Sequence, residues 1–192
     1  ADAWRIGVAP TPALAYLTKS LNCDCGIMIS ASHNPVEDNG IKIFSGEGFK
    51  LDDDSEATIE QLMQCNGRGV RAAGGGEVGC SLDRKNMSNT YVSFIRHMLR
   101  GVYFEGKIIV DCAYGAASRF AKRVFKDAAD KVTFMHADEN GYKINVDCGS
   151  TRPQKLMKRV LKDGALMGFA FDGDGDRVLF VDEKGNLVDG DQ

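Results

Sequence analysis

The spacing of apolar residues changes several times along the chain, and each spacing predicts a different element. Leu14, Leu17 and Leu21 recur at helical intervals after Thr11-Pro12, so we expect a helix with Thr11 as its cap. Short uninterrupted apolar runs predict buried strands. Helices are predicted over residues 11–21, 52–64, 91–99, 116–126 and 153–161, and strands over residues 26–31, 41–44, 107–113, 132–136, 166–172 and 178–182.

Strands that alternate with helices are typical of α/β proteins. We therefore predict layered mixed sheets with flanking helices. The segment 65–81 is rich in glycine, but no strand leads into it and no Gly-Lys-Ser/Thr sequence closes it. These features favour a domain boundary over a phosphate-binding loop. The predicted domains are residues 1–81 and 82–192.

Composition narrows the class of protein. A hydrophobic share of 43% in 192 residues is enough for a globular core. The net charge of -3 does not indicate the basic surface of a nucleic-acid-binding protein, nor the cluster of basic residues that binds anionic membranes. No apolar run reaches the roughly 18 residues that cross a bilayer, and no Cys-x-x-Cys pair occurs. We expect a cytoplasmic protein with reduced cysteines. Because the chain starts without methionine, we expect it to be part of a longer protein.

The segment 30–35, Ser-Ala-Ser-His-Asn-Pro, follows a predicted strand. Ligands of α/β sheets gather beyond the carboxyl ends of strands. A serine hydroxyl needs a base, a metal or prior phosphorylation to react. His33 is adjacent to Ser32 and Lys42 lies on the next predicted strand, so either could place a positive charge near the Ser32 hydroxyl. An ordinary turn, in which Ser and Asn side chains bond their own backbone, has the same composition. Local sequence leaves both interpretations open.

Asp172, Asp174 and Asp176 alternate with glycines directly after a predicted strand. Three carboxylates with this spacing can converge on one hard cation, and ligands that are all oxygen favour magnesium or manganese over zinc. A calcium EF-hand would also use Glu183, but Arg177 stands where that loop needs glycine and the flanks are predicted strands. A solvated acidic turn is the third interpretation. We favour the metal site.

The two loops have complementary chemistry. Ser32 has a hydroxyl that can carry a phosphate group. The aspartates can bind a cation that neutralises this phosphate, and Arg177 can donate two hydrogen bonds to phosphate oxygens. Phosphoryl transfer depends mainly on such positioning and charge stabilisation. The sequence therefore predicts a phosphoryl-transfer site.

Both loops resemble those of a known family, the α-D-phosphohexomutases. Residues 26–35 and 38–42 are similar to its phosphoserine loop, and residues 171–177 are similar to its magnesium loop. Further segments resemble the phosphoglucosamine mutase branch, namely residues 10–17, 110–113 and 148–151. The resemblance spans nearly the whole chain.

This resemblance implies a role for each residue of the site. Ser32 would be the phosphorylated residue, and its phosphate would complete the coordination of one Mg²⁺ held by the three aspartates. Lys42 and His33 would be catalytic residues that handle protons or stabilise charge. Asn34 and Arg177 would bind the substrate or its phosphate.

The resemblance also implies an activity. The enzyme would interconvert glucosamine 6-phosphate and glucosamine 1-phosphate, for cell-wall precursor synthesis, with a sugar 1,6-bisphosphate as intermediate and activator. Its partner would be a phosphosugar, with no nucleic acid and no membrane; a homo-oligomer is left open. Family members have four domains, so this chain would be the end of domain one plus most of domain two. Two alternatives are a phosphomannomutase/phosphoglucomutase and a metal-binding fragment that is inactive when isolated.

Overall fold

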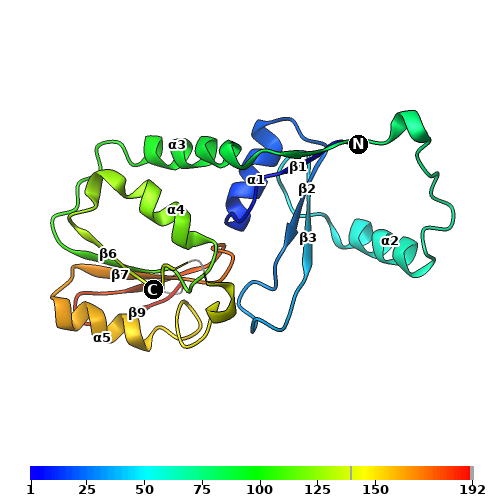
Figure 1. The fold of residues 1–192 in the computed structure, drawn as a ribbon. Coiled ribbons are helices and arrows are strands. Elements are labelled where there is room, and N and C mark those ends of the chain that lie inside the picture. Colours follow the sequence, from blue (N-terminus) through cyan, green and yellow to red (C-terminus); the bar gives the residue numbers. More distant parts are fainter. Residues whose placement is uncertain (139, 191–192) are drawn as a thin grey trace.

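Three sheets and five α-helices organise the described part of the chain, residues 1–138 and 140–190 of a computed structural model (Figure 1). The strands are β1 Ala3–Arg5, β2 Cys25–Ile29, β3 Ile41–Ser45, β4 Ser81–Asp83, β5 Ile108–Asp111, β6 Val132–Met135, β7 Met167–Phe171, β8 Val178–Val181 and β9 Leu187–Val188. The helices are α1 Thr11–Ser20, α2 Asp53–Gln64, α3 Ser88–Met98, α4 Ala117–Val124 and α5 Gln154–Asp163.

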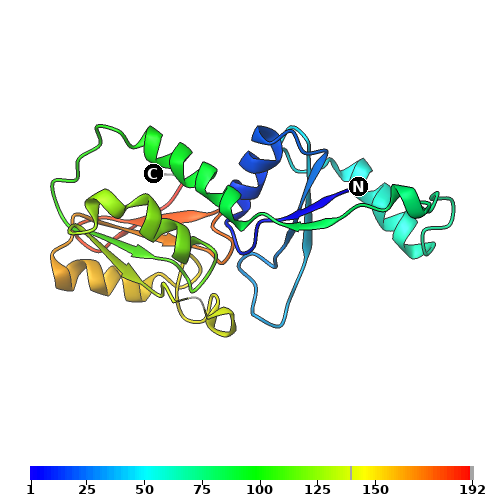
Figure 2. The same cartoon turned by 45° about the horizontal axis from the view of Figure 1, so that its top comes forward.

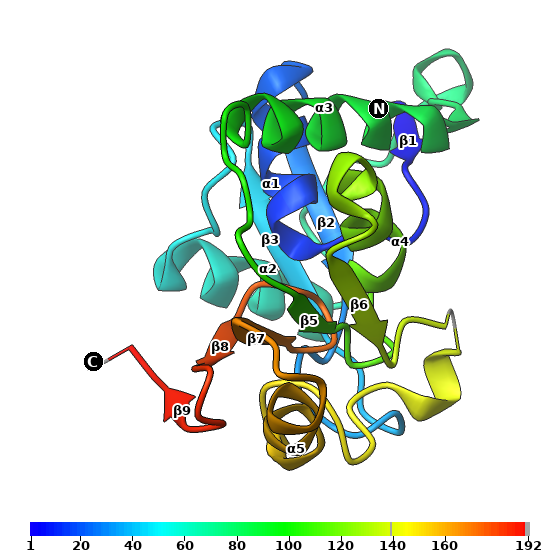
Figure 3. The ribbon, with the colours of Figure 1, turned by 90° about the vertical axis from the view of Figure 1, so that its left-hand side faces the viewer.

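The largest sheet has the strand order β6-β5-β7-β8-β9. Strand β5 runs parallel to β6 and β7, whereas β8 and β9 are antiparallel additions at one edge. Ile108 and Val110 of β5 pack toward α4, and Ile109 packs toward α5. Helices thus cover both faces of the sheet (Figures 1 and 3), which is why β5 is apolar without interruption. This layered mixed α/β architecture confirms the predicted fold class.

The antiparallel pair β2–β3 and helix α1 form the neighbouring part of the molecule (Figure 2). Helix α1 contacts α3 and α4 through an apolar cluster that includes Ala13, Val92 and Phe120. Tyr16 of α1 stacks on Phe94 of α3, with 4.5 Å between the ring centroids. This packing joins the β2–β3 part to the five-stranded part and fixes the loop after β2 against the larger sheet.

Some predicted boundaries and one cap differ from the structure. Helix α3 begins at Ser88, three residues before its predicted start, and Thr11 is not a cap. Pro10 occupies the cap position and makes no side-chain bond there, so Thr11 is the first helical residue. Strands β1 and β4 were not predicted, because they are short, largely solvent-facing, and pair in parallel across a long separation in sequence.

The predicted division of the chain after residue 81 falls inside β4 and stays a prediction. Among the described residues, no helix is both long enough and apolar enough to cross a membrane.

Candidate active site

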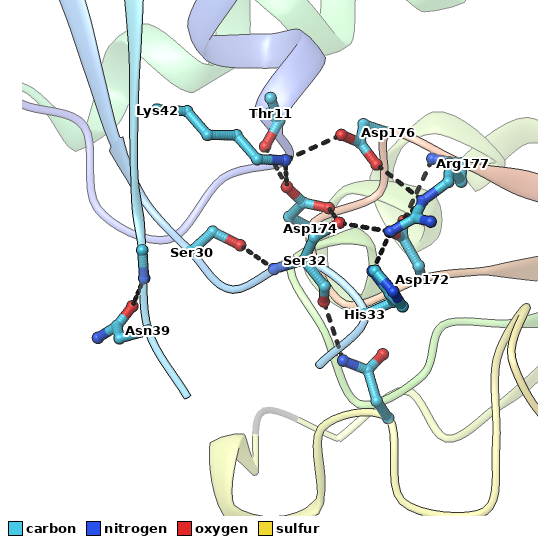
Figure 4. A network of polar contacts seen from close by, with 12 residues as sticks. Thr11, Ser30, Ser32, His33, Asn39, Lys42, Asp172, Asp174, Asp176 and Arg177 are labelled. Atoms are coloured by element: carbon cyan, nitrogen blue, oxygen red, sulfur yellow. Dashed lines mark hydrogen bonds and ion pairs between the residues drawn. The ribbon is translucent and has the colours of Figure 1, made fainter. Parts of the chain in front are cut away.

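Ser32 lies in the loop after β2, with a left-handed backbone φ of 57° that is uncommon outside glycine. The Ser30 hydroxyl accepts the Ser32 N–H at 2.9 Å, as in an ordinary turn. The Ser32 side chain, however, points out of its own loop (Figure 4). Its Oγ lies 2.9 Å from Asp172 Oδ2 and 3.0 Å from Asp174 Oδ1. The two predicted loops therefore meet at this hydroxyl.

The three aspartates occupy the turn between the antiparallel strands β7 and β8. Asp172 and Asp174 are buried, at 0% and 3% exposure, so the solvated-turn interpretation is wrong for them. The flanking strands also exclude the helix–loop–helix of an EF-hand. One oxygen from each of Asp172, Asp174 and Asp176 lies within 4.8 Å of the others. This spacing would allow the three carboxylates to share one cation.

Lys42 reaches this cluster from β3. Its Nζ lies 2.6 Å from Asp174 Oδ2 and 3.0 Å from Asp176 Oδ2. Burial alone would lower the pKa of Lys42, but the hydrogen bonds and charges of the two carboxylates raise it, so the amine stays protonated. Although burial opposes ionisation of Asp174, bonds from Lys42, Thr11 and Ser32 lower its pKa to about 2. Burial and the neighbouring carboxylates raise the pKa of Asp176.

Arg177 links the aspartate turn to the serine loop. Its Nε donates to Asp172 Oδ2 at 3.1 Å, and its Nη2 donates to Ser32 Oγ at 2.9 Å. The same Nη2 contacts His33 Nδ1, and since a guanidinium only donates, that ring nitrogen accepts. The Asn34 amide donates to Asp38 Oδ2, within its own loop, at 3.0 Å.

Two residues of the site were missed from the sequence. Thr11 Oγ1 donates to Asp174 Oδ2 at 2.7 Å, and the Thr11 N–H donates to the Asp174 carbonyl at 2.8 Å. The Asn145 amide donates to the backbone carbonyls of Ser32 and Asn34. Thr11 lies in a sequence that is typical of a helix start, and Asn145 belongs to a segment with no helical or strand pattern. Neither context indicates a residue of the site.

Glycines let the loops approach closely. A Cβ on Gly173 would lie 2.5 Å from the Ser32 carbonyl oxygen, and a Cβ on Gly115 would lie 2.2 Å from the Gly173 carbonyl oxygen. Real Cβ atoms essentially never come this close. A side chain at Gly173 would push the serine and aspartate loops apart, and a side chain at Gly115 would displace Gly173.

The donor set fits a magnesium ion. Its ligand atoms are all oxygens, which suits a hard divalent cation. Three carboxylates face two cationic side chains, Lys42 and Arg177, so the cluster retains negative charge for a bound cation. Asp172, Asp174 and Asp176 would hold the ion, with Ser32 Oγ beside it.

Two family models match the chain. Residues 1–68 match "Phosphoglucomutase/phosphomannomutase, alpha/beta/alpha domain I", and residues 90–185 match domain II of the same family. The serine loop lies in the first match and the aspartate turn in the second.

Individual relatives agree with the family match. The phosphoglucosamine mutase of Syntrophus aciditrophicus is 48% identical over 193 residues, which cover 100% of this chain and 43% of that protein. The chain thus spans less than half the length of the curated relatives it matches.

Solved structures share the fold. A phosphoglucomutase/phosphomannomutase family protein of Burkholderia thailandensis superimposes with a TM-score of 0.80 at 24% identity, over 97% of this chain and 41% of that one. The N-acetylphosphoglucosamine mutase of Aspergillus fumigatus, solved in complex with GlcNAc-6P and magnesium, gives a TM-score of 0.54 at 19% identity, over 94% and 49%.

Proposed function

The chain belongs to the phosphoglucomutase/phosphomannomutase family, and we propose that the full-length protein is a phosphoglucosamine mutase. It would interconvert glucosamine 6-phosphate and glucosamine 1-phosphate. Relatives of that name match the whole chain at close to half identity, which supports the choice of sugar. This chain carries only part of such an enzyme, and we expect it to be inactive when isolated.

One observation carries the proposal: the Ser32 hydroxyl contacts both the aspartate cluster and a guanidinium. Its Oγ lies within 3.0 Å of Asp172, Asp174 and Arg177, although these residues are far away in sequence. A hydroxyl in this position can carry a phosphoryl group whose oxygens face a cation site and Arg177. Neither loop alone has this chemistry.

In the proposed reaction, Ser32 Oγ gives its phosphoryl group to a sugar hydroxyl and later takes back the other phosphate. The sugar hydroxyl must lose a proton as its new bond to phosphorus forms, and Ser32 Oγ must regain one. Lys42 and His33 are the neighbours proposed to hold those protons or balance the charge. Arg177 would hold phosphoryl oxygens, and Asn34 would contact the substrate from the same loop.

Magnesium, held by Asp172, Asp174, Asp176 and a phosphate oxygen on Ser32, would neutralise charge on the transferring group. The magnesium in the A. fumigatus structure supports this choice of ion. A sugar 1,6-bisphosphate is proposed as the intermediate, because transfer of the Ser32 phosphoryl group to a sugar that already carries one phosphate leaves both phosphates on the sugar and none on the enzyme. The same compound, added from outside, would phosphorylate Ser32 and activate the enzyme.

The test uses the full-length protein with glucosamine 6-phosphate, mannose 6-phosphate and glucose 6-phosphate in parallel. We expect the highest kcat/KM with glucosamine 6-phosphate and no turnover after Ser32→Ala. Preference for either other sugar would favour the phosphomannomutase/phosphoglucomutase alternative. Full turnover by Ser32→Ala would remove the phosphoserine from the mechanism.

A further inference from the structure

The backbone of the serine loop is held by a single side chain from the other half of the molecule. Asn145 Nδ2 donates to the Ser32 carbonyl at 2.9 Å and to the Asn34 carbonyl at 3.1 Å. Both hydrogens of the amide are thereby used. We propose that Asn145 is a positioning residue for Ser32, a role that rests on the proposed function.

Asn145 is itself held by the core of the large sheet. Its backbone N–H donates to the Ala113 carbonyl at 3.0 Å. The Ala113 N–H donates in turn to Asp111 Oδ1 at 3.0 Å, and Asp111 is the fully buried last residue of β5. A continuous series of hydrogen bonds therefore runs from the sheet to the Ser32 backbone.

Asp111 also lies beside His136 and Cys148, and these three residues could share an ion. The Asp111 carboxylate, however, already accepts bonds from His136, Ala113 and Gly149. We therefore assign Asp111 to holding the loops that lead to Asn145.

Ser32 needs support of this kind during a transfer cycle. Its φ of 57° is disfavoured for a residue with a Cβ, so other contacts must hold it. The contacts of Oγ with Arg177 and the aspartates must rearrange each time a phosphoryl group arrives or leaves. The bond from Asn145 to the Ser32 carbonyl does not involve the phosphoryl group. It keeps the Cα–Cβ direction constant, and transfer rates depend steeply on such alignment.

The principal variant is Asn145→Asp in the full-length enzyme. Aspartate has nearly the same size and also tolerates the left-handed backbone of this position, where φ is 60°. It replaces the Asn145 NH2 group, which donates both hydrogen bonds, with a carboxylate oxygen that repels the two carbonyls. We expect kcat for the mutase reaction to fall about 10- to 100-fold, as loss of two hydrogen bonds and of alignment implies. The KM should change less than about threefold, because Asn145 does not touch the sugar.

A matched control is Asn66→Asp, which makes the same chemical change at another left-handed residue, φ 52°, whose side chain is exposed. We expect it to keep wild-type kcat. Asn145→Gly is the second variant, because it keeps the backbone freedom, removes both donors and adds no charge. It should lose kcat as Asn145→Asp does, and it decides the question if Asn145→Asp does not fold.

Hydrogen exchange of the amides in segment 30–36 is the structural readout, and it should accelerate in both Asn145 variants by more than exchange elsewhere in the protein, whatever fall in Tm accompanies the lost hydrogen bonds. Wild-type kcat in Asn145→Gly, an effect confined to KM, or an equal loss in Asn66→Asp would overturn the positioning role. Failure of the proposed function is recognised separately, because the wild-type enzyme would then lack mutase activity or Ser32→Ala would retain it.

Discussion

Gly115 lies two residues before α4 and approaches the middle of the aspartate turn. A Cβ there would lie 2.2 Å from the Gly173 carbonyl oxygen and 2.7 Å from the Gly173 Cα. These are backbone atoms, so no side-chain rotation relieves the clash. Gly115→Ala must therefore displace Gly173, and with it the flanking ligands Asp172 and Asp174.

The size of the effect follows from the contact. Ordinary contact with a Cβ begins at 3.4 Å, so the turn must move by about 1 Å. Overpacking of this kind lowers the free energy of unfolding by about 1–3 kcal/mol. The Gly-to-Ala change raises it by about 0.4–1 kcal/mol, because alanine restricts the unfolded chain. Because magnesium demands ligands at about 2.0–2.1 Å in a near-octahedral arrangement, we expect metal affinity to fall more than stability does.

The assay is thermal unfolding of the full-length protein with and without magnesium, together with the magnesium dependence of turnover. Gly115→Ala should lower Tm by about 2–8 °C and raise the magnesium concentration for half-maximal turnover at least about tenfold. Gly141→Ala is the control, since a Cβ there meets nothing within 4 Å. Equal behaviour of the two variants would refute the close packing of Gly115 against the aspartate turn.

Other predictions follow from single contacts. Lys42→Met should reduce kcat by about 100-fold or more, because Asp174 loses a charged partner at 2.6 Å and the site loses its proposed proton carrier. Thr11→Val should lower the unfolding free energy by about 1–2 kcal/mol, since the buried Asp174 carboxylate loses a hydrogen bond. Burial and Asp111 raise the pKa of Cys112 and Cys148 to about 12, so both thiols stay protonated at pH 8 and should resist iodoacetamide in the native protein.

The lysine and cysteine predictions have controls in the same chain. Lys50→Met removes an exposed ion pair with Glu56 and should leave kcat unchanged. The exposed Cys65 and Cys80 should be alkylated within the time that leaves the buried thiols intact, as peptide mass spectrometry can measure. Rapid alkylation of the buried thiols would contradict the described core.

Sequence patterns predicted the core elements because their periodicity follows from burial. Ile108, Ile109 and Val110 are buried on both faces of one strand, which produces an uninterrupted apolar run. Strand β1 has no such signal, since all three of its residues are exposed and its partner β4 lies far along the chain. A helix beginning near Thr11 was predicted, but the cap role given to Thr11 was wrong, because a threonine at a helix start looks the same in sequence whether it caps the helix or binds Asp174.

The two loops could be recognised from the sequence because phosphate and metal chemistry restrict residue types and spacing. Their relative position could not, since it depends on packing between α1, α3 and α4. The role of Asn145 could not be predicted from the sequence for a further reason. Its hydrogen-bond partners are backbone carbonyls, which every residue has, so no residue type marks them.

The central claim is that Ser32 gives its phosphoryl group to the sugar. It is tested most directly by preparing the full-length phosphoenzyme and mixing it with glucosamine 6-phosphate in a single turnover with magnesium. We predict that peptide mass spectrometry shows one phosphate on Ser32 beforehand, and that an isotope label in this phosphate passes to glucosamine 1,6-bisphosphate and then to glucosamine 1-phosphate, while the unlabelled 6-phosphate returns to Ser32. A label that stays on Ser32 throughout turnover, or a phosphate that resides on another residue, would contradict the account.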